Sequence, residues 1–209
     1  MKAAVIKRYG SPDVVKVLEV PKPTPAADEV LIRVRAATVN RTDCGELRAH
    51  PFFVRFFYGL RRPNRTIFGF EFAGEVAAVG ARIRSFKPGD RVFGMCPSRS
   101  NGAHAEYVCV PERMVAAMPA DARFDQAVVC EGAFYVWSSM TRSNRVVMPA
   151  PRRINGFLGF LKGRLETGQF RAIIDRTYDL AAIADAYRYV ETGQKVGIVV
   201  INVAMGGSS

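Results

Sequence analysis

The residue types best suited to metal binding or nucleophilic chemistry are four cysteines and two histidines. Their spacing does not favour either kind of chemistry. The cysteines form no C-x-x-C pair, which excludes a zinc knuckle and a dithiol redox motif; they are Cys44, Cys96, Cys109 and Cys130. The only imidazoles, His50 and His104, are too few for a histidine-based metal site or triad. We therefore expect reduced, mostly buried thiols.

The second candidate for chemistry is the polar segment "NRTD", which follows an alternating apolar run. The change of period after Val39 predicts a strand-to-helix corner, and functional groups often lie at such corners. Asn40 or Thr42 can cap the helix by accepting backbone hydrogen bonds in its first turn. For Asn40, a cap and a functional side chain both remain open. Glu71 is better explained as a hydrogen-bonding carboxylate than as a general base, because no histidine or second acid lies nearby in sequence.

The densest basic cluster is "RFFYGLRRPNR", in which arginines alternate with aromatic residues. Such a segment could bind single-stranded nucleic acid through phosphate contacts and base stacking. It contains Gly59 and Pro63, however, and matches no recognised nucleic-acid module. We interpret it instead as solvated arginines beside a hydrophobic lid, and we do not expect nucleic acid as a partner.

Length and composition indicate a folded globular protein. The chain has 209 residues, 49% of them hydrophobic, and a formal net charge of +11. No run reaches the roughly 18 apolar residues that a membrane span needs, and the first residues do not resemble a signal peptide. These features predict a cytoplasmic protein without a membrane partner.

The elements that must position these residues are β-rich in the first two thirds of the chain. "MKAAVIK", "VVKVLEV", "EVLIRVRAATV" and "GFEFAGEVAAVG" each predict a strand, "FKPGDRVFGM" a turn and a strand, and "AHAEYVCVPERMVAAMP" two further strands. Many short strands between turns indicate a closed or partly closed barrel. A helical pattern over residues 124–140 follows.

The last third predicts a helix, strand, helix, strand order. The first helix ends at Gly168 and the second at Gly193, while "RAIIDRTYDL" and "KVGIVVINV" have the pattern of strands. The fold class is therefore α+β, a β-rich partial barrel with a helix-strand-helix-strand tail.

Several of these segments together resemble a known family. "MKAAVIKRYGSPDVVKVLEVPKPTP", "DEVLIRVRAATVNRTD", "GFEFAGEVAAVG", "FKPGDRVFG" and "GAHAEYVCVPE" are, in this order, similar to the catalytic, GroES-like domain of the medium-chain dehydrogenase/reductase superfamily. The similarity is greatest to its zinc-free, quinone-oxidoreductase-like branch. The tail "LETGQFRAIIDRTYDLAAIADAYRYVETGQKVGIVVINV" resembles the end of the same proteins.

Members of that superfamily carry a Rossmann domain between these two parts, and its glycine-rich turn holds the cofactor diphosphate. The glycines of "GFLGFLKG" have the wrong spacing for such a turn and indicate helix packing. We therefore predict a GroES-like part over residues 1–140, a junction over 141–150 in place of the cofactor domain, a returning part over 151–204 and a disordered tail over 205–209. Removal of that domain would bare an apolar face near Trp137, through which the chain could form a homo-oligomer.

The resemblance also implies site residues. Zinc-dependent relatives have a cysteine and a histidine where this chain has Asn40 and Phe70, which cannot replace them as zinc ligands, so the resemblance implies no metal. It places Asn40 beside the nicotinamide and the substrate carbonyl, with Asp43 bracing the corner and Lys195 near a cofactor phosphate. The resemblance also implies an apolar substrate cleft, which is lined by Phe52, Phe56, Tyr58, Phe70 and Glu131.

Two functions from different classes follow. The first is zinc-independent reduction of a quinone or an α,β-unsaturated carbonyl by hydride transfer from NADPH, the cofactor expected for the family. The second is a non-catalytic binding or interaction module derived from the GroES-like domain, because the chain lacks the dinucleotide-binding motif.

Overall fold

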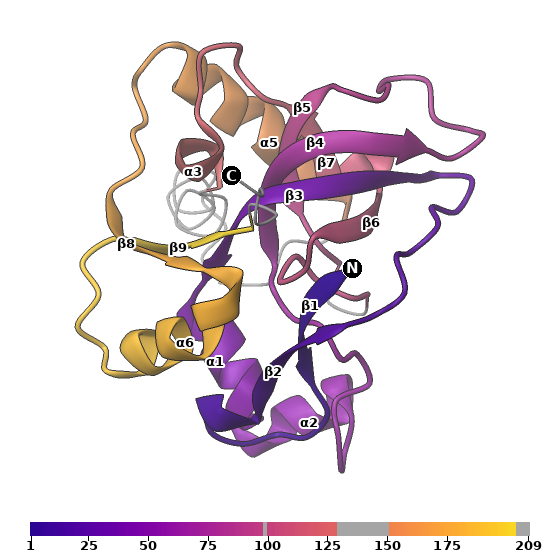
Figure 1. The fold of residues 1–209 in the computed structure, drawn as a ribbon. Coiled ribbons are helices and arrows are strands. Elements are labelled where there is room, and N and C mark those ends of the chain that lie inside the picture. The colour runs from indigo at the N-terminus through magenta and orange to yellow at the C-terminus, as the bar shows by residue number, and fades with distance from the viewer. Residues whose placement is uncertain (98–99, 129–150, 204–209) are drawn as a thin grey trace, which may run out of the picture.

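The computed structural model describes residues 1–97, 100–128 and 151–203, and two sheets organise them (Figure 1). A small antiparallel sheet pairs β1 with β2, and a larger sheet follows the order β7-β5-β4-β3-β9-β8, with β6 added on β3. The strands are β1 (Lys2–Ile6), β2 (Val15–Glu19), β3 (Glu29–Val39), β4 (Glu71–Val79), β5 (Arg91–Met95), β6 (Tyr107–Pro111), β7 (Val115–Ala117), β8 (Ile174–Asp179) and β9 (Ile198–Asn202).

The central strand of the larger sheet is β3, whose eleven residues match the predicted strand. One edge of β3 pairs with β4. Along its other edge, residues Glu29–Arg33 pair with β6 and residues Ala36–Val39 pair with β9. The end of the chain therefore completes the same strand that leads into Asn40.

The sheet is open, so the closed form of the expected barrel is not formed by the described residues. The path ends at β7 on one side and at β8 on the other. Within the described part, β8 and β9 are the one parallel pair, and the crossover between them contains α6. The α+β class and the helix-strand-helix-strand tail are confirmed.

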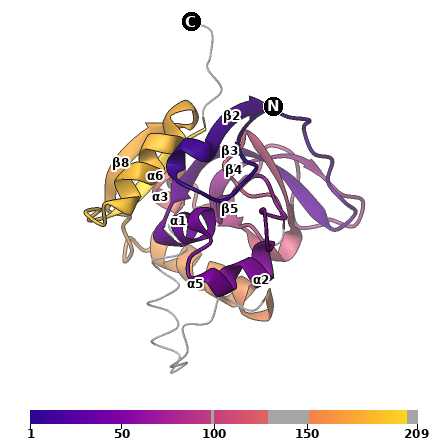
Figure 2. The same ribbon diagram turned by 90° about the horizontal axis from the view of Figure 1, so that it is seen from below.

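Helices cover the sheet on both sides (Figure 1). Their bounds are α1 (Arg41–Arg48), α2 (Arg55–Tyr58), α3 (Phe124–Ala127), α5 (Pro151–Glu166) and α6 (Ile183–Glu191). α1 and α6 contact each other, and α5 packs on β7 and on the 3₁₀ turn Glu112–Met114. Figure 2 views the molecule from the side on which α1 and α2 lie.

Two buried clusters form most of the core. One contains Ile32, Phe68 and Tyr187 and joins β3 to α6, and the other contains Phe93, Phe157 and Leu161 and joins β5 to α5. The tail is thus packed into the same core as the strands from the first part of the chain.

The predicted helix ends are confirmed, because Gly168 and Gly193 both adopt a positive φ that favours glycine. The helix predicted over 124–140 begins at Phe124, but α3 ends at Ala127, Val128 is not helical, and the residues beyond 128 lie outside the described part. The expected junction 141–150, Trp137 and the tail 205–209 also lie outside it. No described helix is long and apolar enough to cross a membrane.

The glycines of "GFLGFLKG" lie inside a helix, as predicted, but no described residue packs closely against them. A Cβ atom added at Gly156, Gly159 or Gly163 would meet no atom of the described residues within 4 Å outside the backbone of α5. Their position inside α5 also excludes a phosphate-binding turn of the kind that follows a strand.

Candidate functional site at the corner between β3 and α1

The corner after β3 gathers the polar residues that the sequence singled out. Asn40 has extended backbone at the first position before α1, and its N–H donates to the Asp43 carboxylate over 2.8 Å. This bond satisfies a backbone donor that the first turn of a helix would otherwise leave unpaired. Asn40 and Asp43 are both buried.

The Asn40 side chain lies in a buried hydrogen-bond network rather than in an open site. Its amide nitrogen donates to the Thr38 hydroxyl over 3.0 Å and to a Glu71 carboxylate oxygen over 3.2 Å. The Thr38 hydroxyl donates to the same Glu71 oxygen over 2.6 Å. Both N–H bonds of the amide are therefore engaged within the protein, and Glu71 serves as an acceptor in the network.

Lys195 closes this network from the tail of the chain. Its ammonium donates to the Asn40 amide oxygen over 3.1 Å, although 155 residues separate the two in sequence. Lys195 is half-buried, so it links the buried corner to the surface. An ammonium has three N–H donors, and a carbonyl oxygen that reaches this surface can accept one of them.

A fully buried histidine lies behind the corner. His104 Nε2 is 2.8 Å from the Thr38 carbonyl oxygen, which can only accept, so this nitrogen carries the proton. Burial lowers the pKa of His104 to about 4, which keeps the ring neutral near neutral pH. His104 Nδ1 is therefore an acceptor, and the Tyr187 hydroxyl donates to it over 3.3 Å.

This histidine makes the stability of the fold sensitive to acid. An unfolded histidine titrates near pH 6.5, whereas His104 titrates near pH 4, so the unfolded chain binds more protons between these values. Its contribution is present above pH 6.5 and is lost as the pH falls towards 4, by on the order of 3 kcal/mol. Urea unfolding across this range, compared with His104→Gln, checks the prediction. Equal pH dependence in both proteins would contradict it.

The residues expected to form an apolar cleft are divided by the structure into two groups. Phe52 and Phe56 contact each other edge-on, with ring centroids 6.2 Å apart, and both are exposed. Tyr58 and Phe70 instead face the guanidinium of Arg65, and Phe70 is buried. Glu131 lies outside the described residues.

Arg65 corrects the expectation of solvated arginines. It is buried against Glu46, with Nε donating to one carboxylate oxygen over 3.1 Å and Nη2 donating to the other. Nη1 also donates to the Ser100 carbonyl oxygen over 3.1 Å. The sequence offered no signal for this pair, because its pattern does not distinguish Arg65 from Arg61 and Arg62, which are exposed.

The described cysteines are free thiols, as expected. Burial raises the pKa of Cys44 and of Cys96 to about 12, and that of Cys109 to about 11. These thiols are protonated at neutral pH and are weak nucleophiles. Cys130 lies outside the described residues.

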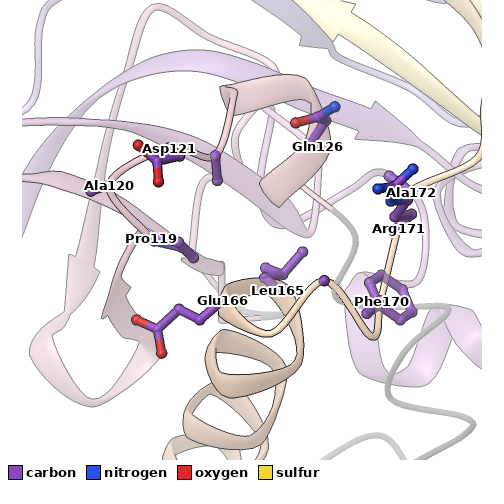
Figure 3. Close-up of a pocket in the computed structure, with 11 residues that line it drawn as sticks. Pro119, Ala120, Asp121, Gln126, Leu165, Glu166, Phe170, Arg171 and Ala172 are labelled. Carbon is purple, nitrogen blue, oxygen red and sulfur yellow. The ribbon is translucent and has the colours of Figure 1, made fainter.

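Two concave surfaces were not expected from the sequence. A pocket of about 700 Å³ lies between the turn after β7 and the end of α5, and Figure 3 shows Asp121 and Glu166 on one side of it with Phe170 and Arg171 on the other. A more open groove of about 680 Å³ lies between α1 and α6. Its lining includes Arg41, which follows Asn40 in sequence, and Gly193, which lies two residues before Lys195.

Metal ligands are not grouped in the described part of the chain, where no three histidine, cysteine, aspartate or glutamate side chains could hold an ion together. A dinucleotide does not fit the described residues either. Its diphosphate requires a glycine-rich turn between a parallel strand and a helix, whereas β8 is followed by the turn Leu180–Ala182, which has no glycine. Residues 129–150 are far fewer than the roughly 100 to 150 of a separate domain.

Comparison with known proteins identifies the family of this fold. Residues 26–120 match the alcohol dehydrogenase GroES-like domain, and residues 97–201, half of the chain, match the zinc-binding dehydrogenase family. The chain belongs to the medium-chain dehydrogenase/reductase superfamily and is quinone-oxidoreductase-like.

Two curated relatives illustrate the similarity. A chloroplastic quinone-oxidoreductase homolog from Spinacia oleracea is 32% identical over 151 residues, which are 70% of this chain and 42% of that protein. A quinone oxidoreductase from Lama guanicoe is 33% identical over 128 residues, 60% of this chain and 36% of that protein. The chain therefore spans less than half the length of these relatives.

The fold is similar to that of solved structures of the superfamily. The quinone oxidoreductase from Coxiella burnetii has a TM-score of 0.81 at 16% sequence identity, and the alignment covers 98% of this chain and 99% of that one. This similarity supports the GroES-like fold, which the sequence predicted from the order of its motifs.

Proposed function

We propose that this chain binds the carbonyl oxygen of a quinone or an enone beside Lys195, as the substrate-holding part of a zinc-independent, NAD(P)H-dependent oxidoreductase. The observation that carries the proposal is the contact between the Lys195 ammonium and the Asn40 amide at the end of β3. It fixes a half-buried cation whose remaining donors can reach a carbonyl oxygen. Relatives named quinone oxidoreductase and NADPH-dependent alkenal/one oxidoreductase support this substrate class.

Each polar residue of the corner has a part in this proposal. Lys195 donates to the substrate oxygen, and Asn40 holds Lys195 in place. Thr38 and Glu71 fix the Asn40 amide, and Asp43 fixes its backbone. We place the ring or the enone in the groove between α1 and α6, whose lining residues Arg41 and Gly193 lie close in sequence to Asn40 and Lys195. Asn40 is thus a positioning residue, since its own donors are already engaged.

Zinc independence is part of the same proposal. Asn40 is committed to its network through both ends of its amide, and the buried Phe70 ring offers no ligand atom. The carbonyl oxygen would therefore be polarised by an ammonium rather than by a metal ion.

A nicotinamide supplies a hydride to a carbonyl compound in enzymes that bind it. The described residues do not fit that cofactor, and we therefore propose that the 209-residue chain holds the carbonyl compound without reducing it alone. This combines the substrate class of the first expected function with the non-catalytic character of the second.

Titration with menadione, followed by ligand-observed NMR, tests the proposal. The Lys195→Met variant is expected to bind roughly tenfold more weakly, because a hydrogen bond from a charged donor is lost. Lys87→Met, which changes an exposed lysine on a distant turn, serves as the matched control. Prior dialysis against EDTA should leave binding unchanged, and NADPH should not be oxidised by the chain with menadione.

The outcomes separate the parts of the proposal. Saturable binding that is equal in wild type and Lys195→Met would reject the carbonyl site. Binding that EDTA abolishes would reject zinc independence. Catalysed oxidation of NADPH would show that the chain seats the cofactor after all.

A further inference from the structure

An exposed apolar cluster lies on the segment between α1 and β4. Phe52, Phe53, Phe56 and Leu60, here called the aromatic tip, are 56% to 72% exposed. They are four of the seven large apolar side chains that are exposed in the described part of the chain. Single exposed apolar residues are ordinary, but a cluster of this kind marks a surface that meets an apolar partner.

The segment that carries the aromatic tip contains charged residues of one sign only. No aspartate or glutamate occurs between Glu46 and Glu71, whereas the same stretch contains five arginines. Arg65 is buried against Glu46 and Arg48 is paired with Glu191, whereas Arg61 and Arg62, which follow Leu60 directly, are exposed. A partner of the aromatic tip must therefore offer an apolar phase with negative charge at its edge.

Hydrogen bonds fix the backbone next to the aromatic tip, at Tyr58 and Gly59, and hold the tip away from the core. The Tyr9 hydroxyl donates to the Gly59 carbonyl oxygen, and the Asn64 N–H donates to that of Tyr58, each over 2.7 Å. Gly59 has a φ of 120°, and a Cβ there would lie 2.1 Å from the Arg62 carbonyl oxygen. In the view of Figure 1, α2 and the turn after it form the lower edge of the molecule.

The form of the aromatic tip distinguishes between two anionic partners. Single-stranded nucleic acid needs ring faces on which successive bases stack. Here the Phe52 and Phe56 rings meet at 88°, and Leu60 has no ring. An apolar projection beside arginines instead matches a bilayer interface, where apolar side chains enter the acyl boundary and arginines meet lipid phosphates.

We infer that the aromatic tip inserts into the surface of membranes that carry anionic lipids, with Arg61 and Arg62 on the lipid phosphates. Apolar insertion and a basic patch are the two signals that together give stable peripheral binding. The chain would lie on the bilayer without crossing it, in agreement with the lengths of its described helices. The net charge of +11 adds a general attraction to such a surface.

Co-sedimentation of the 209-residue chain with phosphatidylcholine vesicles, with and without phosphatidylglycerol, tests the inference. We expect binding to the anionic vesicles that weakens as salt increases. Arg61→Gln/Arg62→Gln should reduce partitioning about 30-fold, since each arginine near the surface contributes ~1 kcal/mol. Phe52→Ser/Phe56→Ser should reduce it at least tenfold. The matched control is Ile173→Ser/Val196→Ser, which removes two exposed apolar residues elsewhere and should bind like wild type.

Three results would overturn the inference. The first is that the wild-type chain does not bind anionic vesicles. The second is that the control variant loses as much vesicle binding as the variants of the aromatic tip. The third is that the chain binds a thymidine oligonucleotide but no vesicles, and that the arginine and phenylalanine substitutions abolish the oligonucleotide binding. Circular dichroism of each variant verifies that the fold is retained.

Discussion

Replacing Arg65 by leucine is expected to lower the free energy of unfolding by about 3 to 5 kcal/mol. The guanidinium is buried and forms two hydrogen bonds with the Glu46 carboxylate. Without it, Glu46 is left in the core as a charge without its cation. Urea unfolding at neutral pH measures the change, and Arg62→Leu, an exposed arginine three positions earlier, should alter stability by less than about 0.5 kcal/mol.

The loss of unfolding free energy caused by Arg65→Leu, here called the stability deficit, should also depend on pH. Burial raises the pKa of Glu46, and Arg65 opposes that rise. In the variant the opposing charge is gone, so the native carboxyl binds its proton more tightly than the unfolded one does. Stability from this group is then present at low pH and is lost as the pH rises, so the deficit should shrink in acid.

The double variant Glu46→Leu/Arg65→Met provides the control for this prediction. Replacing both members of a buried ion pair by apolar residues of similar volume is often neutral. We expect the double variant to be more stable than Arg65→Leu alone. A double variant as unstable as the single one would show that Arg65 acts through Ser100 and the aromatic rings, not through Glu46.

Replacing Phe157 by alanine is expected to cost about 3 to 5 kcal/mol. Phe157 has no exposed surface and packs in the cluster that contains Phe93 and Met114, where α5 meets the sheet. Removing the ring leaves a cavity that the surrounding strands can fill only in part. Chemical unfolding followed by circular dichroism measures the loss.

Phe160, one turn further along α5, is the matched control. Its ring is partly exposed and faces Arg164, 5.1 Å away. Phe160→Ala should cost less than about 1 kcal/mol. If both substitutions had the same small effect, α5 would not be an integral part of the core.

The local elements of the fold could be predicted because their signals are local. The alternation in "EVLIRVRAATV" predicts a strand with the same first and last residues as β3, and glycine at positive φ follows the ends of two helices. The open sheet could not be predicted in this way. Whether β7 and β8 meet depends on the course of the whole sheet, not on any one segment.

The candidate site was predictable by residue but not by contact. The resemblance named Asn40, Asp43 and Lys195, yet it placed Lys195 near a phosphate rather than against the Asn40 amide. The pairs Lys195–Asn40 and Tyr187–His104 join residues 155 and 83 positions apart. Such pairs follow from the return of the tail onto β3, and no spacing in the sequence encodes them.

The pairing of β9 with β3 has a consequence for biosynthesis. Residues Ala36–Val39 are translated well before their partners on this edge, Val199–Asn202. Until then the nascent polypeptide carries an unpaired strand edge, which is a site of mistaken pairing with other chains. Contacts of such long sequence separation also slow folding. A chaperone that shields β3 during translation would therefore raise the yield of native protein.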